Sequence, residues 1–239
     1  MIIRGLVLGT TLLLVTTFAF AQFDPNEISK RLGSGTQGEL SDSKIGSGLK
    51  QALQVGAENA VKLTGRPDGY FRDEAIKIVM PKNLQSFEKG LRAVGEGQKV
   101  DGFILSMNRA AESAAPSAKK IFGDAILAMS FDDARKVLSG GDTAATDYFK
   151  SKTTEQLTAA FRPVVEKTMD ENGVTQQYKA LAGQAQNIPF MKSPNLDITQ
   201  YVVTKALDGL FYMLGQEERK IRKDPAAQTT SLLKEVFGK

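Results

Sequence analysis

The amino-acid sequence predicts an all-α fold: a single-domain bundle of many helices, some of them kinked, over residues 41–239. Apolar residues recur every three to four positions through most of this range, which is the spacing of one buried helix face. The chain contains no cysteine, so no disulfide supports it and the fold depends on a large buried core. Two prolines, Pro116 and Pro163, fall inside helical patterns, where each removes a backbone donor and is expected to kink the helix.

The first 21 residues have the pattern of a secretory signal peptide. A charged head, Met1–Arg4, precedes an apolar stretch over 5–18, and Ala19 and Ala21 supply the small residues that a signal peptidase recognises. The alternative is an uncleaved anchor, but the apolar stretch is shorter than the roughly 20 residues that a membrane span needs. We therefore expect cleavage after Ala21 and export to the periplasm, with no transmembrane segment in the mature chain.

A flexible N-terminal arm is predicted for residues 22–40, because Pro25 and several glycines and serines lie close together there. The first helix then begins at the capping residues Ser41 and Asp42 and stops at Gly65. Small residues four apart on one of its faces would let a neighbouring helix approach closely: Ala52, Gly56 and Ala60.

The segment after the first helix is the best candidate for extended structure. A turn over 66–69 precedes the β-branched run 76–80, which ends at Pro81. A second extended piece, 188–194, is rich in proline and suits only an edge. The all-α prediction therefore allows one short two-stranded β element that pairs 76–80 with 188–192.

The remaining segments have helical patterns. The predicted helices span 82–94, 98–115, 116–129, 131–138, 143–170, 174–186, 197–223 and 226–237.

The absence of histidine, cysteine and tryptophan limits the chemistry that the chain can perform. Serine–histidine–aspartate and cysteine–histidine catalysis are excluded, and so are zinc, haem and iron–sulfur sites built on imidazole or thiolate. Carboxylate pairs, a serine–lysine dyad or an all-oxygen calcium site remain open, but no motif marks any of them. We predict no cofactor and no metal site. Nucleic acid is not an expected partner, because no basic run is interleaved with aromatic residues.

A first candidate site lies in the alanine-rich run SMNRAAESAAPSAKKIF. At 100° per residue, Asn108, Arg109, Glu112 and Lys119 share about a quarter of the helix surface. They could line a polar pocket for an anionic or hydrogen-bonding ligand. The alternative is a structural network in which Arg109 and Glu112 pair at i,i+3.

A second candidate lies in and just before the stretch TKALDGLFYML. Tyr201, Lys205, Asp208 and Tyr212 follow the spacing 0, 4, 7, 11 and form one stripe on a helix whose other face is apolar. Tyrosines beside a lysine and an acid are typical of small-molecule and sugar sites. They are equally typical of a helix edge that meets solvent, with Asp208 paired to Lys205 or to an arginine of another helix.

A third candidate is Arg162, which precedes Pro163 and lies four residues before Glu166. Its planar guanidinium could bind carbonyls that the proline leaves exposed, or a carboxylate. We hypothesise that Arg109 or Arg162 forms an ion pair with Asp208 or Glu112 inside the bundle.

Five segments follow one another along the chain: GLKQALQVGAENAV, SMNRAAESAAPSAKKIF, GGDTAATDYFKSKT, LTAAFRPVVEK and KALDGLFYMLGQEERKIRKDPAA. With these segments the chain resembles an exported protein family of Gram-negative bacteria that is characterised only as a domain of unknown function. The resemblance runs from about Leu40 to Phe237. It implies a mostly helical protein of the cell envelope, and it supplies no catalytic or ligand residues.

The sequence favours a function in binding over catalysis. The expected ligand is an envelope protein or a small molecule held between helices. Two alternatives stay open: a hydrolase or lyase that uses carboxylates such as Glu112 and Asp208, and a structural or assembly role in the envelope.

Overall fold

The computed structural model describes residues 42–171, 173, 176, 197–228 and 234, and this part of the chain is all-α, as predicted. Its α-helices are α2 (Asp42–Gly65), α3 (Gln85–Ala93), α4 (Gly97–Ala114), α5 (Ala118–Ala128), α6 (Phe131–Ser139), α7 (Ala144–Glu171) and α9 (Ile198–Lys223). Short 3-10 turns are η1 (Lys82–Leu84), η2 (Ala115–Ser117) and η3 (Pro225–Ala227).

Local chemistry accounts for several helix ends. Ser130 and Asp133 form a capping box at the start of α6. Asp197 caps α9 by accepting a hydrogen bond from the N–H of Gln200 at 2.9 Å. The last turn of α9 carries Lys220, Arg222 and Lys223, whose charges suit the negative end of the helix dipole.

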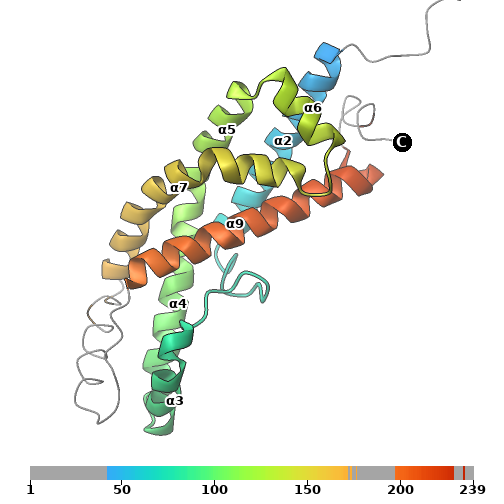
Figure 1. Ribbon diagram of the computed structural model, residues 1–239. Coiled ribbons are helices and arrows are strands. Elements are labelled where there is room, and N and C mark those ends of the chain that lie inside the picture. The colour runs from blue at the N-terminus through green and yellow to red at the C-terminus, as the bar shows by residue number, and fades with distance from the viewer. Residues whose placement is uncertain (1–41, 172, 174–175, 177–196, 229–233, 235–239) are drawn as a thin grey trace, which may run out of the picture. The chain divides into compact units, whose positions relative to one another are not determined.

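Helix α9 is the central packing element. It packs on α2, α4 and α7, and Figure 1 shows it running across α4 and α2. Phenylalanines from α5, α7 and α9 meet in the core, where the rings of Phe122 and Phe149 lie edge to face at 5.0 Å and Phe211 lies 6.2 Å from Phe122.

The small residues of α2 allow a close approach to α9, as the sequence predicted. A Cβ atom on Gly56 would lie 3.4 Å from the Ile221 side chain of α9. At the end of α2, a Cβ atom on Gly65 would lie 3.3 Å from the ring of Pro116.

The two prolines have different effects. At Pro116 the chain leaves α4 and passes through η2 into α5, so one helix ends before the proline and another begins after it. Pro163 lies inside α7, which stays one helix and bends along its length in Figure 1.

The strand predicted at 76–80 is absent, since the described residues contain no strand. Burial still alternates there: Ile76, Ile78 and Met80 are buried, and Lys77 and Val79 are exposed. The predicted partner, 188–192, lies outside the described residues.

The ends of the other predicted helices agree with the structure within a few residues where they can be compared. The predicted helix over 174–186 lies almost wholly outside the described residues, and so does most of 226–237. None of the described helices is long and apolar enough to cross a membrane.

Candidate functional site

The segment 66–81, which joins α2 to η1, is fastened to α4 by Asn108. This side chain is fully buried. Its Oδ1 accepts a hydrogen bond from the N–H of Ile78 at 2.8 Å, and its Nδ2 donates to the carbonyls of Ile78 and Ile104, each at 2.8 Å. Asn108 therefore gives Ile78 the pair of hydrogen bonds that a neighbouring strand would supply.

Glu112 and Arg109 hold the beginning of the same segment. Glu112 is 4% exposed, and its Oε1 accepts hydrogen bonds from the N–H groups of Tyr70 (3.1 Å) and Phe71 (3.2 Å). Arg109 pairs with the other oxygen of Glu112 at 2.6 Å and with Asp68 at 2.6 Å. The hydrogen bonds to Glu112 and Asp68 raise the pKa of Arg109 above its usual value.

The first candidate is therefore a structural network. The hypothesis that Arg109 pairs with Glu112 is confirmed, and the polar groups of Asn108, Arg109 and Glu112 are used by the protein itself. Lys119 does not share their patch. It follows the turn at Pro116, and its Nζ lies 3.8 Å from Glu58 of α2.

Tyr70 joins the same segment to α9. The side chain is fully buried, and its hydroxyl donates to the carbonyl of Ala206 at 2.6 Å. Its ring occupies the space beside Gly209, where a Cβ atom would lie 2.5 Å from the ring. Burial raises the pKa of Tyr70 well above its usual value, because the protein would have to hold a phenolate away from water.

A groove of about 810 Å³ lies between the outer edge of this segment and α9. All four residues of the second candidate stripe line it: Tyr201, Lys205, Asp208 and Tyr212. The other wall is formed by Ala75, Ile76, Lys77, Val79, Met80, Pro81, Lys82, Asn83 and Gln85, and Gly209 lies on the α9 side. The sequence identified the α9 wall of this site and missed the facing wall, although its β-branched residues had marked 76–80 as extended.

Hydrogen bonds and charges define the character of the groove. Tyr201 donates its hydroxyl to the carbonyl of Val79 at 3.0 Å, and burial raises its pKa. Lys205 pairs with Asp208 at 2.9 Å, which raises the pKa of the lysine. Lys77 lies over the ring of Phe71, with its Nζ 4.4 Å from the centroid. The described residues that line the groove therefore include more lysines than acids: Lys77, Lys82 and Lys205 against Asp208.

Arg162 lies apart from both clusters, at the junction of α7 with the start of α9. It hydrogen-bonds Gln200, and its guanidinium lies 3.7 Å from Asp197 and 3.6 Å from Glu166. Arg109 thus fulfils the ion-pair hypothesis, while Arg162 pairs with Glu166 and Asp197, the carboxylates that lie near it where α7 meets the start of α9.

Glu112 and Asp208 do not form a pair of accessible carboxylates. Glu112 accepts three hydrogen bonds and does not line the groove, while Asp208 is paired with Lys205. Among the described residues no group of acids could hold a metal ion.

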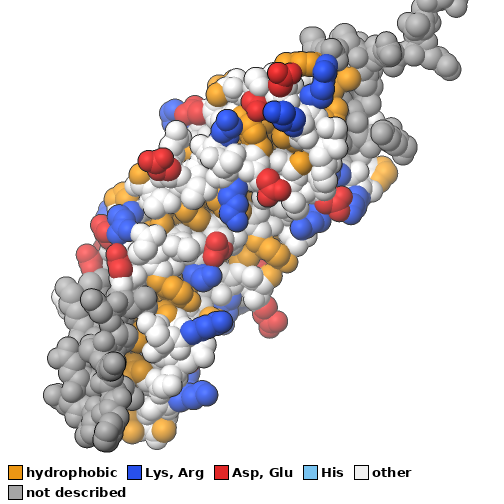
Figure 2. All heavy atoms as spheres, viewed as in Figure 1, with side chains coloured by type: hydrophobic (Ala, Val, Ile, Leu, Met, Phe, Trp, Pro, Cys, Tyr) orange, Lys and Arg blue, Asp and Glu red, His pale blue; other side chains and the backbone are white. Residues whose placement is uncertain are grey.

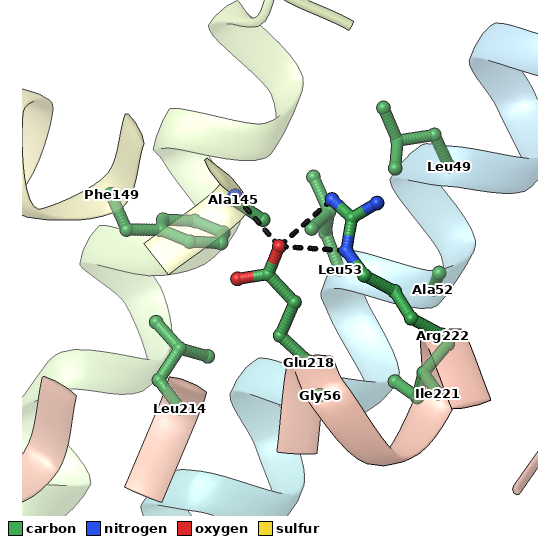
Figure 3. A pocket seen from close by; sticks show the side chains of 10 residues that line it. All are labelled: Leu49, Ala52, Leu53, Gly56, Ala145, Phe149, Leu214, Glu218, Ile221 and Arg222. Carbon is green, nitrogen blue, oxygen red and sulfur yellow. Dashed lines mark hydrogen bonds and ion pairs between the residues drawn. The ribbon is translucent and has the colours of Figure 1, made fainter. Parts of the chain in front are cut away.

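A second cavity, between α2, α7 and α9, is small and mainly apolar. Its volume is about 20 Å³, room for about one water molecule. Figure 3 shows Glu218 pointing from α9 toward Ala145 and Arg222. The carboxylate accepts hydrogen bonds from the N–H groups of Ala145 (2.9 Å) and Thr146 (2.8 Å), so it caps the start of α7. Its role is structural, and no local pattern in the sequence marks it.

Comparison with known proteins gives a family and no function. No curated protein and no solved structure matches the chain. A family model described as "Protein of unknown function (DUF4197)" matches residues 39–238. That range covers most of the chain, so the protein belongs to the DUF4197 family.

Proposed function

We propose that this protein is exported to the periplasm of a Gram-negative bacterium and acts there by binding a ligand in the groove between α9 and residues 75–85. The groove itself carries the proposal. It brings the aromatic and charged stripe of α9 against a second wall that lies more than a hundred residues earlier in the chain.

Exposed side chains on both walls of the groove are available to a ligand. Val79 is 51% exposed and Tyr212 is 44% exposed, so each wall presents a large apolar group to solvent. Lys205 and Asp208 are 45% and 53% exposed and could exchange part of their mutual pairing for a ligand. Exposed apolar surface that is edged by polar groups is typical of a binding site.

Binding is favoured over catalysis by the residues that are present. The chain has no histidine or cysteine to act as a base or nucleophile, and Asp208 is the only acid among the described residues that line the groove. A carboxylate mechanism needs two acids placed across a cleft.

The partner is not expected to be nucleic acid. Figure 2 shows acidic and basic side chains interspersed over one face of the molecule, with apolar groups between them. A nucleic-acid surface would instead concentrate lysine and arginine on one face.

The proposal can be tested by ¹⁵N–¹H NMR of the protein with probes of three classes: short peptides, oligosaccharides and fatty acids. We expect at least one class to shift the amide signals of residues 75–85 and 201–212. Tyr212→Ala should weaken that binding, whereas the matched control Lys120→Ala, on the exposed surface of α5, should not. Failure of every class at millimolar concentration, or shifts confined to other regions, would overturn the proposal.

A further inference from the structure

We propose that the occupant of the groove is an acidic peptide segment in extended conformation, about five residues long, supplied by a partner protein. The inference rests on the proposed function of the groove, and it adds the chemical class of the ligand.

The charge of the groove favours an acidic occupant. Asp208 is neutralised by Lys205, so Lys77 and Lys82 are in excess. Lys77 contacts the face of Phe71, and Lys82 is exposed where it lines the groove. Two carboxylates of a bound segment would complement these two ammonium groups.

The length of the groove favours an extended peptide. Tyr201 and Tyr212 are eleven positions apart on α9, which corresponds to about 16 Å at 1.5 Å per residue. An extended chain advances about 3.3 Å per residue, so about five residues would cover the stripe. The exposed side chains of Val79 and Tyr212 leave the groove open to a segment of a larger chain.

The order of side chains along the stripe favours a peptide over a lipid or a sugar. Lys205 and Asp208 lie between the two tyrosines, and a fatty acyl chain along the stripe would desolvate that ion pair without replacing its contacts with water. A neutral sugar would leave the charges of Lys77 and Lys82 unused. An extended peptide alternates its side chains, so it can place apolar groups against Tyr201, Val79 and Tyr212 and acidic groups near the lysines.

The test is a fluorescence-anisotropy titration of the full chain with labelled seven-residue peptides. One probe alternates Asp or Glu with Phe or Leu, a second replaces each acid by Lys, and a third replaces each acid by its amide. We expect the acidic peptide to bind at least tenfold more tightly than either counterpart, and we expect its affinity to fall with added salt.

Charge-reversal variants locate the binding site. Lys77→Glu and Lys82→Glu should each weaken the acidic peptide about tenfold, and Lys120→Glu should leave its affinity unchanged. All three lysines are exposed, so circular dichroism should show unchanged helix content in each variant. Equal binding of the three peptides, or no effect of either groove variant, would overturn the inference.

The NMR experiment described above, with the same peptides added, separates this inference from the proposed function. If dodecanoate or an oligosaccharide shifts the groove amides and no peptide does, the peptide assignment is wrong and the groove is still a binding site. If no probe of any class reaches the groove, both proposals are wrong.

Discussion

Buried polar side chains of α4 bond to the backbone of the 66–81 segment as a neighbouring strand would in a sheet. Asn108 pairs with both backbone groups of Ile78, and Glu112 accepts the N–H groups of Tyr70 and Phe71. These bonds give backbone groups of an irregular segment partners where the segment lies against the core.

Replacing Glu112 by Ala should lower the free energy of unfolding by about 2–4 kcal/mol, because the backbone N–H groups of Tyr70 and Phe71 lose their acceptor. Arg109 would keep its ion pair with Asp68. Glu112→Gln should cost less, since the amide oxygen can still accept from the backbone. Urea denaturation measures both. The matched control is Asp124→Ala, which removes an exposed i,i+4 pair with Lys120 and should change stability by less than about 1 kcal/mol. A cost for Glu112→Ala no larger than that control would contradict the assigned role.

The buried hydroxyl of Tyr70 should make the protein sensitive to alkaline pH. Burial raises the pKa of Tyr70 in the folded state, while the unfolded chain ionises near the usual value of about 10. Below that pH Tyr70 is protonated in both the folded and the unfolded state, so its ionisation does not lower the free energy of unfolding. Above it the unfolded state loses its proton first, so the free energy of unfolding should fall by up to about 1.4 kcal/mol per pH unit.

The comparison of the protein with Tyr70→Phe isolates this effect. At neutral pH the variant should be less stable by about 1 kcal/mol, because the hydrogen bond to Ala206 is lost. Between about pH 10 and about pH 11.5 the difference should shrink or reverse, since the variant has no hydroxyl to ionise. Parallel stability curves over that range would contradict a raised pKa of Tyr70 in the folded state.

A side chain of α9 caps the start of α7 and so joins the two helices. Glu218 of α9 binds the first free N–H groups of α7, and Arg222 pairs with it at 2.8 Å and also donates to the carbonyl of Val137. Glu218→Ala should cost about 3 kcal/mol or more and should speed hydrogen exchange at Ala145 and Thr146. The matched control is Glu171→Ala, whose exposed pair with Lys167 should contribute little. Unchanged exchange at both amides would show that the cap has no energetic role.

The approach of the 66–81 segment to α9 depends on Gly209. A methyl group there would overlap the ring of Tyr70, so Gly209→Ala should destabilise the protein by about 1–3 kcal/mol. Gly102→Ala, on the exposed side of α4 with open space around it, should instead add up to about 1 kcal/mol through helix propensity. Thermal unfolding measures both, and equal shifts of the two variants in the same direction would contradict the packing argument.

At the scale of the whole molecule, the groove exists because two distant stretches of chain are brought together. Asn108 of α4 holds Ile78, Tyr70 joins the preceding turn to α9, and Tyr201 of α9 donates to the carbonyl of Val79. The shape of the groove therefore depends on buried hydrogen bonds that lie outside it.

The N-terminal region supports a prediction about processing. Protein isolated from the periplasmic fraction should begin at Gln22, because residues 1–21 have the charged head, apolar stretch and small residues of a cleaved signal. Intact-mass measurement checks this directly. Ala21→Phe should block cleavage, since the position needs a small residue, whereas the matched control Ala21→Gly should be processed normally. A chain that retains Met1 in the membrane fraction would contradict the prediction.

Patterns local to the chain predicted the helices well. An α-helix closes its hydrogen bonds within four residues and shows its buried face every three to four residues, so its position can be read from neighbouring residues alone. The small face of α2, a break in the helix at Pro116 and the stripe on α9 were all visible in this way. The missing histidine and cysteine excluded whole classes of chemistry, because no fold can supply a side chain that the chain lacks.

Contacts between distant residues were decided by tertiary packing. The run 76–80 has the residue types of a strand, yet its central residue bonds to a side chain of α4, a partner that no local pattern identifies. Lys119 shares a helical-wheel position with Asn108, but the turn at Pro116 takes it to Glu58. The stripe on α9 became one wall of a groove because Tyr70 and Asn108 hold the other wall against the bundle. Such long-range contacts depend on how the helices pack, and the periodicity of the sequence does not encode that packing.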